Sequence, residues 1–408
     1  MIRIALLGLL LGLYTNVQAQ KTLVTATLAL PYETQQPNAI SQVESLNPFF
    51  DKLAELKTRQ TGVINILHIG DSHLQADLMT HIVRKRFQYE FGNAGRGFIV
   101  PFHVARTNEP YTYKTNSDVI WESRRCVMPN DLIPNGIGGV TVRNTVAGKR
   151  INVEIRSDSA LGYQFDRLKL FCLRDSNSYD YNILDASGAI MASAEYADSV
   201  AGQQPYQIDL HELNDSFTLE SVQSRPGQTH ATIFGFSLEN GQPGVLYHTV
   251  GVNGAQYSHY NESQYFAEQT RGLAPHLVIV SLGTNESHSS KLTMPELTMQ
   301  IDSMVQAIQR NNPEAIVLLT TPADSYKRRT QPNAKMGEVR QTILDYANQH
   351  HLPCWDLYGI TGAASFWRKN HLIGSDGVHY TRKGYEFQGN LLYQALMNAF
   401  NEYVTDRL

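Results

Sequence analysis

The stretch VINILHIGDSHL, residues 63–74, joins an apolar run to a Gly-Asp-Ser turn. Its first part, Val63–Gly70, predicts a buried β-strand, because it is rich in β-branched side chains and ends in glycine. A helix is predicted to follow and to stop at Phe91-Gly92-Asn93, with one apolar face made of Leu74, Leu78, Ile82 and Phe91. Ser72 therefore lies between the C-terminal end of a strand and the start of a helix, where open α/β sheets bind their ligands.

The same alternation returns in the last part of the chain. Four apolar runs predict strands, namely LYHTVGV (246–252), HLVIVSLG (276–283), AIVLLTTP (315–322) and LPCWDLYG (352–359). Helices are predicted between and after them, at Pro295–Asn312, Lys335–His350 and Thr381–Val404. Strands that alternate with helices predict an α/β domain with a parallel sheet.

The middle of the chain has a different pattern. Short runs such as KRINVEIRS and HATIFGFSL are separated by Asn, Asp, Ser, Gly and Pro. This pattern is typical of an antiparallel β-sandwich. We therefore predict one α/β domain in two parts, residues 20–100 and 245–408, interrupted by an inserted β domain at residues 101–244.

The first residues, MIRIALLGLLLGLYTNVQAQ, have the layout of a secretory signal peptide. Arg3 precedes an apolar run, Ile4–Tyr14, and cleavage after Ala19 is predicted, so that residues 1–19 are removed. An uncleaved anchor is the competing interpretation, but the run is well short of the roughly 20 residues of a membrane span. Without a later apolar segment, the sequence predicts a periplasmic or secreted protein that has no integral membrane segment after cleavage.

Composition excludes two further classes. The net charge of −4 and the lack of a basic cluster argue against a nucleic-acid partner. The three cysteines, Cys126, Cys172 and Cys354, are too few and too widely spaced for a disulfide scaffold or a zinc site, and buried free thiols are favoured over a single bridge. The histidines lack a ligand spacing, so no metal or other cofactor is predicted.

A serine hydroxyl becomes a nucleophile only when a base takes its proton and donors stabilise the oxyanion that forms. The segment GSDGVHYT places Asp376 and His379 three residues apart, so that a carboxylate can orient an imidazole. Two other predicted strands are followed by Asn253-Gly254-Ala255 and by Thr284-Asn285-Glu286. Gly254 and Asn285 offer the uncharged N–H donors that an oxyanion hole needs.

These four blocks together resemble the SGNH, or GDSL-type, hydrolases: GDSH around Ser72, VNGA around Gly254, GTNE around Asn285, and DGVH around Asp376 and His379. The resemblance implies a flavodoxin-like three-layer fold. It also implies that Ser72 is the nucleophile, His379 the general base and Asp376 its orienting carboxylate, with an oxyanion hole formed by the N–H groups of Ser72 and Gly254 and the amide of Asn285. The second block departs from the commoner spacing, which leaves Gly251 as the alternative to Gly254.

A leader peptide and a β insert after the first block look like the peptidoglycan O-acetylesterases of Gram-negative bacteria, whose insert resembles a carbohydrate-binding module. This resemblance implies an acetylated glycan, either peptidoglycan or another polysaccharide, as the substrate of an exported serine esterase. Two alternatives remain open: an O-acetyltransferase that acts on cell-wall glycan, and a non-catalytic glycan-binding protein on a hydrolase scaffold.

Other side chains near the motifs are predicted to be structural. Asp71 is expected to accept backbone N–H groups of the serine loop, and His73 to pack against the sheet. Three aromatic residues of the insert are expected in the sandwich core rather than on a sugar-binding surface: Tyr111, Tyr113 and Trp121.

Overall fold

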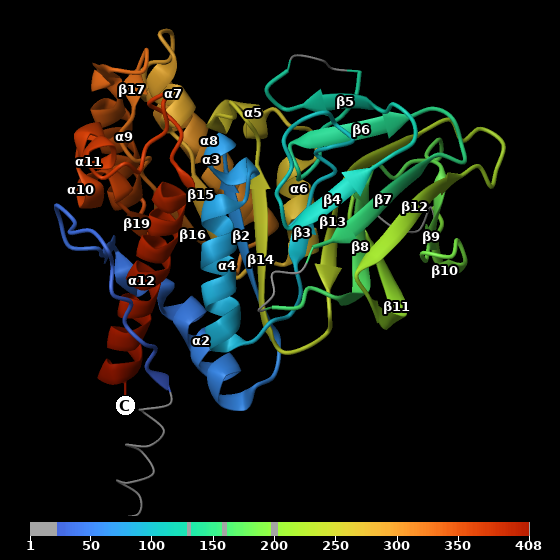
Figure 1. The fold of residues 1–408 in the computed structure, drawn as a ribbon, viewed down its shortest axis with the longest axis horizontal. Helices are drawn as coiled ribbons and strands as arrows, with labels where there is room; N and C mark the ends of the chain where they lie inside the picture. The colour runs from blue at the N-terminus through green and yellow to red at the C-terminus, as the bar shows by residue number, and fades with distance from the viewer. Residues whose placement is uncertain (1–22, 129–131, 157–160, 197–202, 408) are drawn as a thin grey trace, which may run out of the picture.

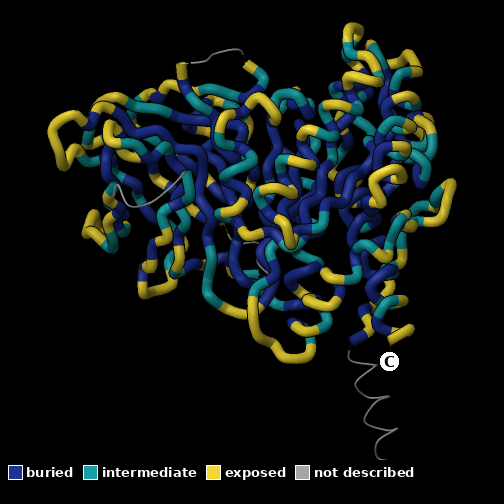
Figure 2. Tube along the Cα trace, turned by 180° about the vertical axis from the view of Figure 1, so that it is seen from behind, coloured by how far each residue is buried: buried dark blue, intermediate teal, exposed yellow. Residues whose placement is uncertain are grey.

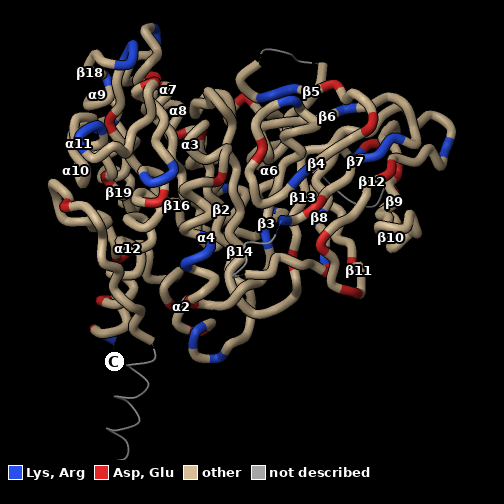
Figure 3. Tube along the Cα trace, viewed as in Figure 1, with Lys and Arg blue, Asp and Glu red and all other residues tan. Residues whose placement is uncertain are grey.

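The computed structural model describes residues 23–128, 132–156, 161–196 and 203–407, so the predicted signal peptide lies outside the described residues. Figure 1 shows a layered α/β part beside an all-β part. Basic and acidic residues are interspersed along the chain of both parts (Figure 3). Within the described ranges, no helix is both long enough and apolar enough to cross a bilayer.

The α/β part is built on a six-stranded sheet in the order β1-β19-β16-β15-β2-β14. All neighbouring strands are parallel except β1, which pairs with β19 in the antiparallel sense. The register sets Gly70 beside Gly251 and Ser281, so three strand ends meet at one edge. The strands are β1 (Ile40–Ser41), β2 (Val63–Gly70), β14 (Gly244–Gly251), β15 (Leu277–Ser281), β16 (Ile316–Thr320) and β19 (Cys354–Trp355).

Helices cover both faces of this sheet, which confirms the predicted three-layer α/β fold. The first face buries Ile64 and Ile66 among α2 (Asn47–Arg59), α4 (Leu78–Phe91) and α12 (Arg382–Asp406). The second face buries Leu67 and Ile69 in a core that includes α8 (Met294–Asn311) and α9 (Ala334–Gln349). Shorter helices complete the layers: η1 (Val43–Leu46), α3 (Ser72–Gln75), α5 (Tyr257–Asn261), α6 (Phe266–Thr270), η2 (Arg271–Leu273), α7 (Thr284–His288), α10 (Leu357–Thr361) and α11 (Ala364–Lys369).

The insert consists of two antiparallel sheets, as predicted. One has the order β10-β9-β12-β7-β4, and the other β11-β8-β13-β6-β5 with β3 beside β13. Phe217 packs edge to face on Phe165 and Phe236 between them. The strands are β3 (Gly97–Ile99), β4 (Tyr113–Asn116), β5 (Glu122–Arg125), β6 (Val140–Asn144), β7 (Arg150–Ile155), β8 (Phe165–Cys172), β9 (Asp180–Leu184), β10 (Ile190–Ala194), β11 (Tyr206–Asn214), β12 (Ser216–Val222) and β13 (Ala231–Glu239).

The two parts share one hydrophobic core. Val140 and Phe234 of the insert belong to the same buried cluster as Leu67 and Val250 of the parallel sheet. Figure 2 shows buried chain in the interior of both parts. The strand β3 precedes the predicted boundary at residue 101 but pairs with β13, so the β part begins a few residues earlier than the sequence pattern indicates.

Two predicted elements differ in the structure. The single helix expected after β2 is split into α3 and α4, because Asp77 between them has a left-handed φ of 56° and directs its carboxylate to the buried Arg84 and Arg96. The strand expected in 352–359 shrinks to β19, because Asp356 caps α10 by accepting the N–H of Gly359. A small hairpin, β17 (Tyr326–Lys327) and β18 (Gln331–Pro332), follows β16.

The three cysteines are free and buried. Burial raises the pKa of each thiol to about 12, which makes them unreactive at neutral pH. Tyr113 and Trp121 are buried in the core, as expected. The same expectation is wrong for Tyr111, which is exposed and lies 5.2 Å from the guanidinium of Arg382 on α12.

Candidate active site

Ser72 is the first residue of α3, directly after the end of β2. Asp71 caps this helix: one of its carboxylate oxygens accepts the N–H of His73 at 2.9 Å. Tyr260 donates its hydroxyl to the carbonyl of Gly70 at 2.7 Å, which fixes the strand end. The hydroxyl of Ser72 is therefore held, half-buried, on a short turn between two rigid elements.

The structure brings Ser72, His379 and Asp376 into one hydrogen-bonded chain. The Oγ of Ser72 lies 2.9 Å from Nε2 of His379, and Nδ1 of the same imidazole lies 2.7 Å from Oδ2 of Asp376. With the proton on Nδ1, the ring donates to the carboxylate and accepts from the serine. This is the geometry in which an imidazole can remove the serine proton.

The loop between α11 and α12 carries both Asp376 and His379 and holds their side chains in position. The other oxygen of Asp376 accepts the N–H groups of Val378 and His379 at 2.9 and 3.0 Å. Although partial burial alone would raise the pKa of Asp376, the hydrogen bonds from His379 and from the backbone lower it below its ordinary value. Asp376 is therefore a carboxylate at neutral pH and can stabilise a positive imidazolium.

Of the two candidate glycines, Gly254 lines the cleft at Ser72, whereas Gly251 ends β14. Gly254 is exposed, has a φ of +84° and shares the lining of this cleft with Ser72 and Asn285. A Cβ atom on Gly251 would lie only 2.6 Å from the backbone nitrogen of Gln75. Gly251 therefore serves the packing of α3 against β14.

Asn285 also lies at the cleft, but its side-chain amide is occupied. It donates to the carbonyl of Ala255 at 2.9 Å and to the carboxylate of Asp71 at 3.2 Å. Both amide hydrogens are thus used inside the protein. The amide can reach a substrate oxygen only by sharing or exchanging the longer bond, the one to Asp71.

Burial shifts the pKa values of the two residues that flank Ser72. Burial raises the pKa of Asp71 to about 7, against the opposing effect of the His73 N–H. Burial, reinforced by the nearby His379, lowers the pKa of His73 to about 3. His73 packs on the rings of His379 and Tyr380 rather than on the sheet as predicted, and its Nδ1 lies 3.0 Å from the hydroxyl of Tyr385. It is a neutral side chain that supports His379.

Three polar residues of the site were not predicted from the sequence. The buried carboxylate of Glu286 accepts the N–H groups of Tyr257 and Gly283, and so joins the loops that follow β14 and β15; burial raises its pKa to about 7. Gln75 and Asn108 form a second network beside Ser72. The sequence could have indicated Gln75 as a site residue, because it is polar and lies three positions after Ser72.

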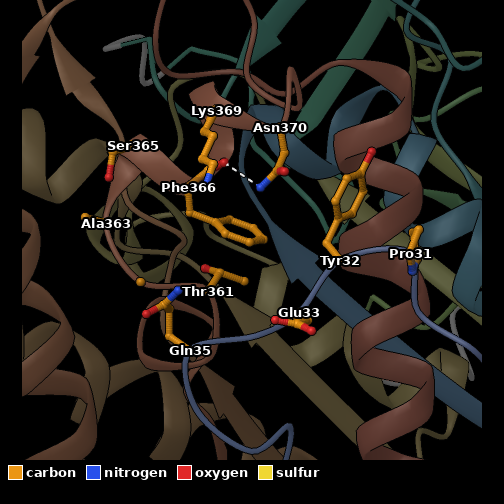
Figure 4. Close-up of a pocket in the computed structure, with 11 residues that line it drawn as sticks. Pro31, Tyr32, Glu33, Gln35, Thr361, Ala363, Ser365, Phe366, Lys369 and Asn370 are labelled. Atoms are coloured by element: carbon orange, nitrogen blue, oxygen red, sulfur yellow. Dashed lines mark hydrogen bonds between the residues drawn. The ribbon is translucent and has the colours of Figure 1, made fainter.

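The cleft at Ser72 has a volume of about 510 Å³ and is lined by Ser72, Ala76, Asn108, Asn253, Gly254, Asn285, Val378, His379 and Tyr385. A larger hollow of about 640 Å³ lies between the segment 31–35 and α10–α11 (Figure 4). Tyr32 and Phe366 line it, together with Glu33 and Lys369. The residues proposed for chemistry line only the first of these two hollows.

No group of three or more His, Cys, Asp or Glu side chains suited to hold a metal ion occurs among the described residues.

A three-layer α/β fold that aligns a serine, a histidine and an aspartate at the ends of its strands defines the class of serine-type hydrolases. Residues 215–387 match the model of the GDSL-like Lipase/Acylhydrolase family, a range that contains Gly254, Asn285, Asp376 and His379 but not Ser72. Over this range the chain is similar to the GDSL-like, or SGNH, family of lipases and acylhydrolases.

One solved structure extends the comparison to most of the chain. A structure described as a peptidoglycan O-acetylesterase in action is similar with a TM-score of 0.72 and 22% identity, covering 89% of this chain and 99% of that one. The likeness therefore includes the inserted β domain. A lipase/acylhydrolase from Enterococcus faecalis (TM-score 0.31, 20% identity, 38% of this chain and 77% of that one) and an acetyl xylan esterase (0.31, 18%, 37% and 81%) are also similar. No curated protein sequence matches the chain.

Proposed function

We propose that this protein is an exported serine esterase that removes O-acetyl groups from a carbohydrate, namely peptidoglycan, through an acetyl-enzyme on Ser72. The observation that carries this proposal is the hydrogen-bonded chain from Ser72 through His379 to Asp376, which opens into a cleft beside Gly254 and Asn285. Acetyl esters need no metal or redox partner for hydrolysis once the serine is activated.

In the first step, the Oγ of Ser72 attacks the ester carbonyl while Nε2 of His379 takes its proton. Asp376, which accepts from Nδ1, orients the ring and stabilises the imidazolium that forms. His379 then returns the proton to the leaving sugar oxygen as the ester bond breaks. Water, deprotonated by the same imidazole, attacks the acetyl-enzyme, and acetate leaves as Ser72 regains its proton.

The negatively charged oxygen that forms in each addition step must be stabilised by hydrogen-bond donors. The N–H groups of Ser72 and Gly254 and the amide of Asn285 are proposed to supply them. Because the amide of Asn285 is bonded to Asp71, its donation to substrate requires that the 3.2 Å bond give way. A developing oxyanion is a strong acceptor and can compete for that hydrogen.

The substrate class rests on the similarity of the complete two-part architecture to a protein described as a peptidoglycan O-acetylesterase. A cleft of about 510 Å³ with wide access suits an acetyl group on a bulky polymer. The leader sequence supports an exported location, periplasmic or secreted, where such a polymer is found.

The test is acetate release by the mature protein from O-acetylated peptidoglycan and, separately, from an acetylated plant polysaccharide. Ser72→Ala serves as the matched control, since it removes only the hydroxyl. Release from peptidoglycan that the variant abolishes would support both nucleophile and substrate. Release from the plant polysaccharide alone would move the proposal to another glycan. No release from either polymer by the wild-type protein would contradict the proposed esterase.

A further inference from the structure

A buried glutamine connects three separate segments beside the cleft. Gln75, on α3 and 1% exposed, accepts the backbone N–H of Asn253 at 2.7 Å through its side-chain oxygen. Its side-chain nitrogen lies 3.0 Å from the hydroxyl of Thr107 and 2.8 and 2.9 Å from the two oxygens of Asn108. One side chain thus links the helix of Ser72, the turn of Gly254 and a loop of the β insert.

The loop and the turn are also bonded to each other directly. The side-chain nitrogen of Asn253 donates to Oδ1 of Asn108 at 2.6 Å. The loop itself is held to the α/β part, because Arg96 donates to Thr112 at 3.0 Å and Arg382 packs over the ring of Tyr111. Asn108 is therefore presented to the cleft by a loop whose following residues, Tyr111 and Thr112, are held to the α/β part.

Residues 252–255 form a four-residue turn, and the orientation of its central peptide decides whether it is of type I or type II. Ala255 donates to the carbonyl of Val252 at 2.9 Å, and the φ of +84° at Gly254 is the value that a type II turn requires at its third position. Types I and II differ by rotation of the central peptide, here the bond between Asn253 and Gly254. That rotation reverses the direction of the Gly254 N–H.

We infer that Gln75 and Asn108 are positioning residues that hold the Asn253-Gly254 peptide in its type II orientation, with the Gly254 N–H available to the reacting ester oxygen. The inference rests on the proposed function of the cleft. The inserted β domain then completes the active site through Asn108, in addition to any contact that it makes with glycan. Because the insert also shares the hydrophobic core with the parallel sheet, the two parts act as one catalytic unit.

The test compares Asn108→Ala and Asn108→Asp with His103→Ala, an exposed side chain in the same loop that serves as the matched control. The substrate is 4-nitrophenyl acetate, which is too small to need a glycan-binding surface. Complete loss of one oxyanion donor lowers kcat about 100-fold to 1000-fold. A donor that is only loosened, as expected in Asn108→Ala, should therefore lower kcat on the order of 10-fold. KM should stay within about twofold of the wild-type value. Asn108→Asp keeps an acceptor oxygen for both donors and should recover most of the loss, whereas His103→Ala should match the wild type.

A second measurement is independent of catalysis. Amide hydrogen exchange of the Asn253 N–H, which Gln75 accepts, should be faster in Asn108→Ala than in the wild type and unchanged in His103→Ala. Wild-type kcat together with wild-type exchange in Asn108→Ala would overturn the inference, as would an effect on KM alone, which would make Asn108 a substrate contact. If the wild type hydrolyses no ester, the proposed function fails, and the exchange measurement still decides whether Asn108 positions the turn.

Discussion

The Nε2 atom of His379 lies 2.9 Å from the Oγ of Ser72, although the two residues stand 307 positions apart in the chain. The contact exists because β2, which lies between β15 and β14, ends at Gly70, two residues before Ser72, while the loop before α12 lies over the same strand ends. The same loop carries Asp376, so one rigid segment delivers both partners of the serine.

Asp376→Asn should lower kcat for acetate esters by at least about 100-fold, since an amide cannot stabilise the imidazolium and can impose the wrong tautomer on His379. The side-chain oxygen that accepts the N–H groups of Val378 and His379 is retained, so the loop should stay folded. Steady-state kinetics and a thermal melt check the two expectations. Unchanged kcat in a folded variant would remove Asp376 from the mechanism.

Gly254→Ala should mainly lower kcat, whereas Gly251→Ala should mainly lower the stability of the protein. A Cβ on Gly254 meets only Val127, at 3.9 Å, but a left-handed φ strains alanine by about 1–2 kcal/mol, so this variant should fold and lose kcat. A Cβ on Gly251 meets backbone at 2.6 Å, and overpacking of this kind costs about 1–3 kcal/mol. Melting temperature and kcat of both variants separate the roles. Loss of kcat without loss of stability in Gly251→Ala would reverse the assignment.

The pH dependence of stability should carry a contribution from Asp71. Its carboxyl takes up a proton near pH 7 in the folded state but only near pH 4 in the unfolded chain, where its ordinary pKa is about 3.9. Between these values the folded state binds more protons, so stability from this group falls as pH rises, by up to about 1.4 kcal/mol per pH unit.

The measurement is urea unfolding of the wild type and Asp71→Asn from pH 5 to pH 8. The free energy of unfolding of the wild type, relative to that of the variant, should decrease across this range. Titrating groups that do not interact with Asp71 are present in both proteins and cancel in the difference. A constant difference would mean that Asp71 is already ionised at pH 5.

Asp77→Ala should destabilise the protein by about 3–5 kcal/mol, because it leaves two buried guanidinium groups without their counter-charge. Arg84 and Arg96 both bond its carboxylate at 2.7 Å, and all three side chains are at most 1% exposed. Glu55→Ala is the control, since its pair with Arg59 is exposed and should contribute less than about 1 kcal/mol. Chemical denaturation of both variants measures the contrast, and equal losses would contradict it.

Much of the fold could be predicted because its signals are local. The apolar run of Val63–Gly70 and the helical periodicity of α8, α9 and α12 follow from side-chain spacing alone, and so does the β character of the insert. The split between α3 and α4 was missed, because the partner of Asp77 at Arg96 lies beyond the helix that it interrupts. The exposed position of Tyr111 was missed for the same kind of reason, since Arg382 comes from the far end of the chain.

The sequence by itself determined that a serine stands at the end of a strand, that a histidine and an aspartate lie three residues apart on a late loop, and that a β domain interrupts the α/β domain. These features depend on the order and spacing of residues. Only the tertiary structure decided that Asn285 is bonded to Asp71, that Glu286 joins two loops and that Asn108 reaches the turn of Gly254. Such contacts depend on which strand ends are adjacent and on how closely the two parts pack, and neither is encoded in any local stretch of the chain.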